Sequence, residues 1–162
     1  MREASVCEVS CMELNLKLPD ADATLELGRK LARVLRPGIV IYLVGDLGTG
    51  KTTLARGVLR GLGYVSHVAS PTFNLVVPYE ISGLHLLHFD FYRLRDRNEW
   101  KDAGFEEYFS SGNVCLIEWP ENAGELPGAD IKILLRHAAA AREVTISSES
   151  EIGEKCLSGL DV

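Results

Sequence analysis

The sequence has no hydrophobic run that approaches the roughly eighteen residues needed to cross a membrane. Residues 1–4 lead into no apolar segment of the kind found in the middle of a secretion signal. The pattern therefore gives no support to membrane insertion or export, and we expect a soluble protein of the cytoplasm.

Cysteine is scarce and poorly spaced for a metal site or a disulfide framework. The four cysteines, Cys7, Cys11, Cys115 and Cys156, form neither a C-x-x-C pair nor a clear zinc-binding spacing. Small domains that depend on disulfides carry cysteine at a much higher density. We expect reduced, structural thiols, although Cys7 and Cys11 are near enough in sequence to lie close together.

Runs of positive charge are missing as well. The formal net charge is -6 and the isoelectric point is near 5.2, which argues against broad electrostatic capture of RNA or DNA by this chain alone. The arginines at 93, 95 and 97 alternate with Asp96 and precede Glu99, a pattern typical of a solvated helix start. A partner protein can still present the chain to nucleic acid.

Internal repeats and low-complexity segments are also absent. With 162 residues, of which 46% are hydrophobic, the chain can bury one substantial core but is short for two. We therefore expect a single domain over residues 1–162.

What the chain does contain is a glycine-rich segment, residues 45–53 (GDLGTGKTT), directly behind the apolar run 39–44. It fits the P-loop pattern G-x-x-x-x-G-K-[ST]. In such a loop, glycines let backbone N–H groups turn toward a phosphate, and the following helix adds the positive end of its dipole. Leu54, Val58 and Leu62 have the spacing of that helix. The segment predicts a nucleoside triphosphate site, the alternative being a glycine-rich turn without a ligand.

The side chains of this loop have distinct expected roles. Lys51 is expected to reach the outer phosphates, and Thr52 to give its hydroxyl oxygen to Mg²⁺. The expected nucleotide contacts are Asp46, Leu47, Gly48, Thr49, Gly50, Lys51, Thr52 and Thr53. Adenine contacts cannot be read from the sequence, so a contact from Thr24, like a phosphate contact from Arg142, stays open.

The remaining chain alternates apolar strands with two or three helices. We expect a first strand over 8–18 and a helix from Asp22 or Thr24 that ends before Pro37-Gly38. Residues 73–80 and 84–91 predict two strands whose short connection cannot hold a crossover helix, so they should form an antiparallel hairpin.

Beyond the hairpin, residues 99–110 predict one helix, or two short ones broken near Gly104. Residues 114–117, 131–136 and 143–147 predict further strands, and the tail from 148 is expected to be frayed or peripheral. The expected architecture is a three-layer α/β, P-loop NTPase-like fold with a mixed parallel and antiparallel central sheet.

Asp90 follows a strongly apolar strand in the segment 88–93 (HFDFYR). A lone acid at a strand end is often only a turn or helix cap. A P-loop, however, requires a second acidic element that binds Mg²⁺, directly or through water, or orients the attacking water. Asp90 is the first candidate for this role, and His88 can neighbour it or serve as a structural residue.

Glu118 ends a second apolar strand, in the segment 114–121 (VCLIEWPE). An acid after four hydrophobic residues resembles the end of a Walker B strand, and phosphates and metals sit at this end of open α/β sheets. Glu118 is therefore a candidate metal ligand or general base. Trp119 can pack beside the nucleotide, belong to a partner surface, or anchor the edge of the core.

Thr72 lies in the short segment 69–73 (ASPTF), between the P-loop helix and the hairpin. A threonine in such a loop can sense the γ-phosphate or its metal, so that the loop is ordered in only one nucleotide state. The alternative is an ordinary turn set by Pro71.

Together these segments resemble the TsaE family of bacteria, small ATPases required for threonylcarbamoyl-adenosine (t6A) modification of tRNA. The family pattern has Gly-Asp-Leu-Gly-x-Gly-Lys-Thr-Thr, then Ser-Pro-Thr-Phe, His-x-Asp-x-Tyr-Arg and an acid-Trp pair. The chain carries these at 45–53, 70–73, 88–93 and 118–119. The resemblance spans roughly residues 22 to 147, and only the P-loop is widely shared with other folds.

The resemblance implies an ATP- and Mg²⁺-dependent ATPase that is weakly active alone. It implies partners, a TsaD-like threonylcarbamoyl transferase and a TsaB-like scaffold protein, with tRNA reached only through the complex and no membrane involved. Hydrolysis is implied to reset the transferase complex between rounds of modification.

The same resemblance implies roles for individual residues. Lys51 and Thr52 hold phosphates and metal, and Glu118 completes the Mg²⁺ shell, so that Thr52 and Glu118 are the metal ligands. Asp90 and Trp119 are implied to be needed for turnover or coupling, as members of a catalytic set of Asp90, Glu118, Trp119 and the switch residue Thr72. Asp90 and Glu118 can still exchange the roles of base and ligand.

Two other functions are compatible with a P-loop. A small-molecule kinase could hold its acceptor with Asp90 and Arg93, but after Pro120 only Arg136 and Arg142 remain to cover the phosphates. A GTP-gated interaction module would normally carry an N/T-K-x-D loop and a D-x-x-G switch, and the sequence has neither.

Overall fold

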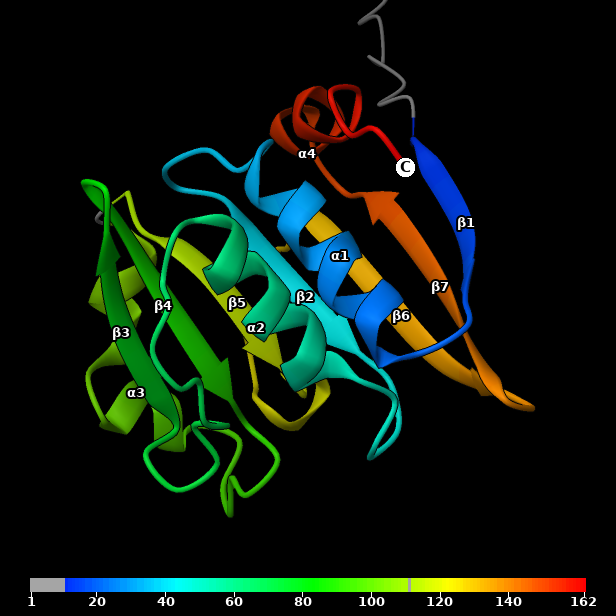
Figure 1. Ribbon diagram of the computed structural model, residues 1–162. Helices are drawn as coiled ribbons and strands as arrows, with labels where there is room; N and C mark the ends of the chain where they lie inside the picture. Colours follow the sequence, from blue (N-terminus) through cyan, green and yellow to red (C-terminus); the bar gives the residue numbers. More distant parts are fainter. Residues whose placement is uncertain (1–10, 111) are drawn as a thin grey trace, which may run out of the picture.

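A computed structural model describes residues 11–110 and 112–162, which form a mixed seven-stranded sheet with helices on both faces (Figure 1). The strands are β1 (Glu13–Leu18), β2 (Val40–Val44), β3 (Val76–Ile81), β4 (Leu84–Asp90), β5 (Val114–Glu118), β6 (Ile131–Ala138) and β7 (Ala141–Ser148). The helices are α1 (Ala21–Ala32), α2 (Lys51–Gly61), α3 (Glu99–Asp102), α4 (Glu151–Leu157) and the 3₁₀ helices η1 (Phe105–Phe109) and η2 (Pro120–Asn122).

The strand order is β1-β7-β6-β2-β5-β4-β3. The four central strands β6, β2, β5 and β4 run parallel, whereas the β3–β4, β6–β7 and β1–β7 pairs are antiparallel. The mixed sheet and the antiparallel hairpin predicted from the sequence are both confirmed. The parallel centre places the carboxyl ends of β2, β4 and β5 at the same edge of the sheet.

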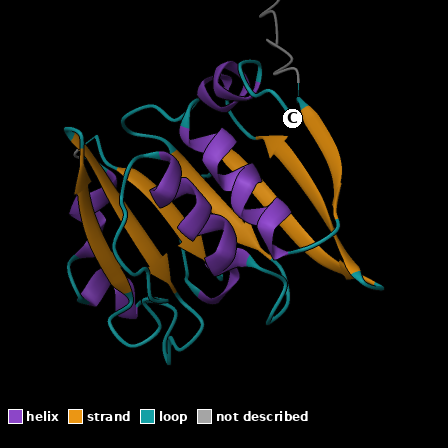
Figure 2. Ribbon diagram, in the orientation of Figure 1, coloured by secondary structure: helices purple, strands orange, loops and turns teal. Residues whose placement is uncertain are grey.

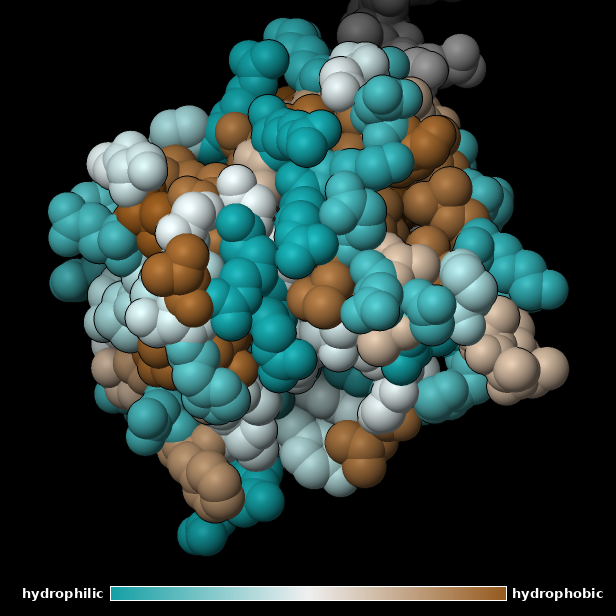
Figure 3. All heavy atoms as spheres, viewed as in Figure 1, coloured by the Kyte–Doolittle hydropathy of each residue, from teal (hydrophilic) through white to brown (hydrophobic). Residues whose placement is uncertain are grey.

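The sheet separates two apolar cores, as a three-layer fold requires. Helices α1 and α2 cover one face, where α2 buries Leu54, Val58 and Leu59 against β2 and β5 (Figures 1 and 2). On the other face, α3 and η1 pack on β4 and β5 with an aromatic cluster that includes Phe89 and Trp100. Figure 3, in the view of Figure 1, shows that the outer surface over α1 and α2 is mostly hydrophilic.

Helices α1 and α2 approach each other closely through glycine. A Cβ added to Gly57 would lie 2.3 Å from the backbone oxygen of Leu25, and one added to Gly28 would lie 2.5 Å from that of Leu54. No side chain fits at these distances. The two glycines therefore fix how tightly the helix that follows the P-loop packs on its neighbour.

Several element boundaries differ from the predicted ones. β1 begins at Glu13, while residues 8–10 of the expected strand lie outside the described residues. Helix α1 begins at Ala21 because Asp20 caps it, its carboxylate accepting from the Ala23 N–H at 2.8 Å. Of the two alternatives for residues 99–110, the broken one is correct, since Gly104 adopts a positive φ of 79° between α3 and η1.

Of the two alternatives for the tail from residue 148, frayed or peripheral, the frayed one is wrong. Ser150 caps helix α4 by accepting from the Gly153 N–H at 3.1 Å, and its own hydroxyl donates to the Asp130 carboxylate at 2.6 Å. Cys156 and Leu157 are buried in the same core as residues of α1 and β6. Local capping and two buried side chains hold this terminal segment in a helix. Within the described residues, no helix is both long enough and apolar enough to span a bilayer.

Candidate functional site

The predicted chemical residues meet at the carboxyl edge of the parallel strands. Asp90 at the end of β4 is the register partner of Glu118 at the end of β5, and Leu43 of β2 is the partner of Glu118 on the other side. The loop that follows β2 is the glycine-rich segment, so it lies beside both acids. Parallel register thus brings together residues separated by more than seventy positions in the chain.

The glycine-rich segment wraps around the start of α2 with a backbone that favours glycine. Gly48 has φ of 78° and Gly50 has φ of 105°, a region that other residues enter only at a cost. Gly50 is the N-cap of α2 and provides no side-chain cap, so the first N–H groups of an 11-residue helix are left for another acceptor. This arrangement suits an anionic ligand.

Lys51 folds back over this loop and is almost fully buried, with 4% of the residue exposed. Its ammonium nitrogen donates to the carbonyl oxygens of Gly45 at 2.6 Å and Asp46 at 2.8 Å. Burial lowers the pKa of the amine, whereas the nearby carboxylates of Glu118, Glu121, Asp90 and Asp46 oppose that shift. A buried cation held by neutral carbonyls is well placed to meet phosphate oxygens.

Thr52 and Glu118, the two predicted metal ligands, are in direct contact. The Thr52 hydroxyl donates to the Glu118 carboxylate, 2.9 Å from Oε1 and 3.1 Å from Oε2. Both are oxygen donors, the kind that Mg²⁺ prefers, and Mg²⁺ usually keeps water and phosphate oxygens as its remaining ligands. No group of three or more His, Cys, Asp or Glu side chains in the described part of the chain could bind a metal without such help. The residues present therefore fit a nucleotide-bound Mg²⁺ better than a protein-only metal site.

Asp90 contacts the predicted switch segment rather than the metal ligands. Its Oδ2 accepts from the hydroxyls of Ser70 at 2.7 Å and Thr72 at 3.1 Å, and its Oδ1 accepts from the Tyr92 N–H at 2.9 Å. The Asp90 side chain is buried, with 3% of the residue exposed. The carboxylate therefore connects the end of β4 to the loop that precedes β3. Sequence reasoning named Thr72 and Asp90 separately and missed Ser70.

Trp119 comes directly after Glu118 and has an unusual backbone conformation. Its φ of 57° and ψ of 48° are left-handed, and Pro120 begins the short helix η2 behind it. The indole ring lies under the Lys51 amine, 4.2 Å from nitrogen to ring centroid, and packs 4.9 Å from the Tyr92 ring. The ring thus lies beside the Lys51 amine and is also packed, partly buried, against the aromatic cluster that contains Phe89 and Trp100.

Two residues near the loop were open or missed in the sequence. Arg142 of β7 donates to the Thr24 hydroxyl at 3.3 Å, and its side chain passes beside Gly50, where an added Cβ would be 3.3 Å from its Nε. The His137 ring at the end of β6 contacts the Leu47 carbonyl at 3.3 Å. Both come from the β6–β7 hairpin, which no local motif links to the P-loop. Leu47, one of the expected nucleotide contacts, is 67% exposed at the tip of the loop.

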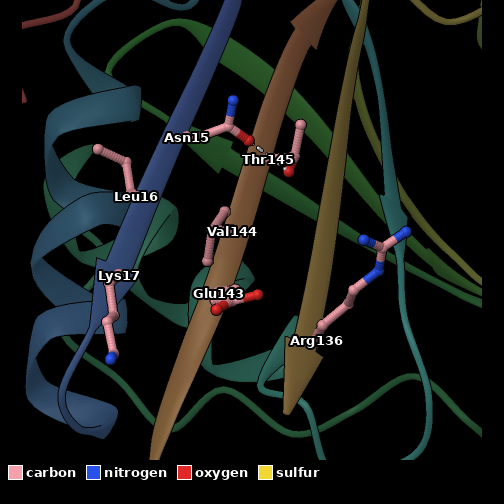
Figure 4. A pocket seen from close by; sticks show the side chains of 7 residues that line it. All are labelled: Asn15, Leu16, Lys17, Arg136, Glu143, Val144 and Thr145. Carbon is pink, nitrogen blue, oxygen red and sulfur yellow. Dashed lines mark hydrogen bonds between the residues drawn. The ribbon is translucent and has the colours of Figure 1, made fainter. Parts of the chain in front are cut away.

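A separate shallow hollow lies on the β1–β7–β6 side of the sheet (Figure 4). Asn15 and Thr145 share a 2.8 Å hydrogen bond across β1 and β7, and Lys17 and Arg136 flank Glu143. Its charges of opposite sign are interleaved on exposed strand positions. The hollow includes none of the residues predicted to act on a nucleotide.

The chain is similar to known proteins over most of its length. The family model described as "Threonylcarbamoyl adenosine biosynthesis protein TsaE" matches residues 18–144. A tRNA threonylcarbamoyladenosine biosynthesis protein TsaE from Haemophilus influenzae is 41% identical over 147 residues, covering 87% of this chain and 93% of the relative. The protein of the same description from Bacillus subtilis is 37% identical over 138 residues, covering 84% and 86%.

A solved structure has the same fold. The crystal structure of YdiB from Bacillus subtilis superimposes with a TM-score of 0.80 at 30% identity, over 93% of this chain and 95% of the other. The range matched by the family model includes the loop at 45–53 and the acids Asp90 and Glu118. This chain belongs to the TsaE family.

Proposed function

We propose that this chain binds ATP with Mg²⁺ and hydrolyses it, as the ATPase required for t6A modification of tRNA in the cytoplasm. The observation that carries the proposal is the direct Thr52–Glu118 contact beside the buried Lys51 amine at the N-terminus of α2. The relatives are described as tRNA threonylcarbamoyladenosine biosynthesis proteins, which supports the pathway.

Each side chain has a role that follows from its position. The uncapped N–H groups at the start of α2 and the Lys51 ammonium bind the phosphates. Thr52 and Glu118 hold the Mg²⁺, which would supply charge stabilisation for the departing phosphate. The rest of the expected set, Asp46 to Gly50 and Thr53, surrounds the phosphates through the loop backbone.

We propose different roles for the two acids, on the basis of their different contacts. Glu118 touches the Thr52 hydroxyl and is the metal ligand, whereas Asp90 accepts from Ser70 and Thr72 and is the acid that responds to the loop. Nucleotide binding that recruits the Thr72 hydroxyl would release one of the bonds on Asp90 and free that carboxylate to orient water. Asp90, Thr72 and Trp119 thereby connect hydrolysis to the outer surface of the molecule.

We propose that a TsaD-like transferase and a TsaB-like scaffold use this surface, with tRNA reached only through the complex. Phe73 of the switch segment is 81% exposed and stacks under the Arg93 guanidinium at 4.4 Å. Phe73 directly follows Thr72 in the sequence, and Arg93 directly follows Tyr92. An exposed aromatic residue beside a nucleotide-sensing loop is a natural point of contact for a partner. The net charge of -6 suits a protein that acts through tRNA-binding partners.

The test is ATP hydrolysis by the purified chain with Mg²⁺, first alone and then with TsaB-like and TsaD-like proteins and tRNA. We expect slow turnover that rises in the complex and is lost in Lys51→Ala, Asp90→Ala and Glu118→Ala. Calorimetric titration should show that Lys51→Ala fails to bind ATP and that Asp90→Ala still binds it. Phosphate transfer from ATP to a small metabolite, without stimulation by the partners, would contradict the proposal and favour a kinase.

A further inference from the structure

We propose that His88 is a positioning residue that fixes the Glu118 carboxylate for Mg²⁺ binding. The inference rests on the proposed nucleotide-bound Mg²⁺ and adds a residue of this chain that holds one of the metal ligands in place. Metal-binding groups are commonly oriented by such outer partners, whose loss costs about 10- to 100-fold in metal affinity.

The geometry places His88 directly behind Glu118. His88 lies on β4 two residues before Asp90, and its register partner on β5 is Leu116, two residues before Glu118. Its Nε2 is 2.8 Å from Glu118 Oε1, and both side chains are almost inaccessible, at 0% and 3% exposure. Water does not compete for this contact, so the hydrogen bond restricts how the carboxylate can rotate.

The other ring nitrogen makes no hydrogen bond that would account for a histidine at this position. His88 Nδ1 is buried and has no hydrogen-bond partner among residues 11–110 and 112–162. An unsatisfied buried polar atom costs about 1–3 kcal/mol. Alternate residues of a strand share a face of the sheet, so His88 lies on the same side as the buried, apolar Leu86 and Leu116. What a histidine contributes at this position is therefore its contact with Glu118.

The two oxygens of the Glu118 carboxylate have different sets of hydrogen-bond partners. Oε1 accepts from both His88 and Thr52, whereas Oε2 accepts from Thr52 at 3.1 Å. Once the Thr52 hydroxyl turns its oxygen to a metal, the histidine still holds Oε1 and the carboxylate keeps its orientation. His88 with its Nε2 protonated therefore prevents Glu118 from turning away when its other partner leaves.

The test compares metal affinity with nucleotide affinity in His88 variants of the full chain. His88→Met removes the donor at similar volume, His88→Gln keeps an N–H near the Nε2 position, and His88→Asn keeps one only near Nδ1. ADP affinity is measured by calorimetry in EDTA, and Mn²⁺ affinity of the ADP complex by electron paramagnetic resonance, with circular dichroism as the check on folding. The same substitutions are made in a Glu118→Gln background.

We expect His88→Met and His88→Asn to bind ADP in EDTA as the wild type does, but to bind Mn²⁺ about tenfold more weakly, with His88→Gln near the wild type. If His88→Met does not fold, the Gln and Asn pair gives the same comparison. In the Glu118→Gln background the His88 substitutions should have no further effect on metal affinity. Equal metal affinity in folded His88→Asn and wild type, or an equal loss in both backgrounds, would overturn the inference. A wild type that binds no ADP would instead overturn the proposed function, and this inference with it.

Discussion

The ammonium nitrogen of Lys51 lies 4.2 Å from the centroid of the Trp119 ring, so the proposed phosphate-binding cation rests on an aromatic face. Such cation–π contacts contribute about 0.5–2 kcal/mol, the larger values applying where water is excluded. The lysine therefore has three sets of partners in this state: two loop carbonyls, the indole, and the surrounding carboxylates. Phosphate binding must draw the amine away from the ring.

This contact makes Trp119 a reporter of nucleotide binding. Addition of ATP and Mg²⁺ should produce a saturable change in tryptophan emission, because the charge above the indole moves. The only other tryptophan, Trp100, is buried in the aromatic cluster beside β4 and β5, with its Nε1 bonded to the Gly124 carbonyl at 2.9 Å. Trp100→Phe should keep the signal, and Trp119→Phe should lose it. A response that survives in Trp119→Phe would contradict this prediction.

Asp90 should control the order of the switch segment. Asp90→Ala removes the acceptor of the Ser70 and Thr72 hydroxyls and of the Tyr92 N–H, and hydrogen bonds to a charged group contribute about 1.5–3 kcal/mol each. We expect faster amide hydrogen exchange over residues 69–75 and a free energy of unfolding lower by about 2 kcal/mol or more. Ser70→Ala, which removes one of the three hydrogen bonds to Asp90 together with the Ser70–Thr72 contact, is the control with a smaller effect. Unchanged exchange in Asp90→Ala would show that the loop is held by other contacts.

Gly57→Ala should destabilise the protein although alanine is the better helix former. In an exposed helix the change would gain about 1 kcal/mol. Here the new Cβ would lie 2.3 Å from the Leu25 carbonyl oxygen, and overpacking of this kind costs about 1–3 kcal/mol. Denaturant unfolding measures the difference. Gly159→Ala is the control at an uncrowded position, because the atom nearest to an added Cβ there, Val34 Cγ1, is 3.5 Å away. A stabilised Gly57→Ala would mean that the helices can separate at little cost.

Cys115 should be unreactive in the folded protein. Burial raises the pKa of its thiol to about 12, so roughly one molecule in ten thousand carries the thiolate at pH 8. Burial also raises the pKa of Cys156, whereas Cys11 is exposed. Alkylation by iodoacetamide, mapped by mass spectrometry, should modify Cys11 first and Cys115 and Cys156 only in guanidinium chloride. Native Cys115 labelled as fast as Cys11 would show that β5 opens readily.

The outcome for particular elements shows what sequence patterns can and cannot give. The β3–β4 hairpin follows from a connection too short for a helix, which is a geometric constraint that no tertiary contact can override. The tail was mispredicted because α4 depends on Ser150 reaching Asp130 and on core contacts of Leu157, which have no local trace in the sequence. The apolar spacing that indicated helix α2 starts at Leu54, but the helix itself begins at Lys51, inside the glycine-rich loop.

By itself the sequence determined the P-loop and its neighbouring strand and helix, because those nine residues carry their chemistry in contiguous backbone. It also identified Asp90, Glu118, Trp119 and Thr72 as the residues to examine. Only the tertiary structure decided which acid faces which partner, since the parallel register of β4 and β5 sets Asp90 against the switch segment and Glu118 against Thr52. The contact of His88 with Glu118 was decided in the same way, because strand pairing brings together side chains thirty positions apart.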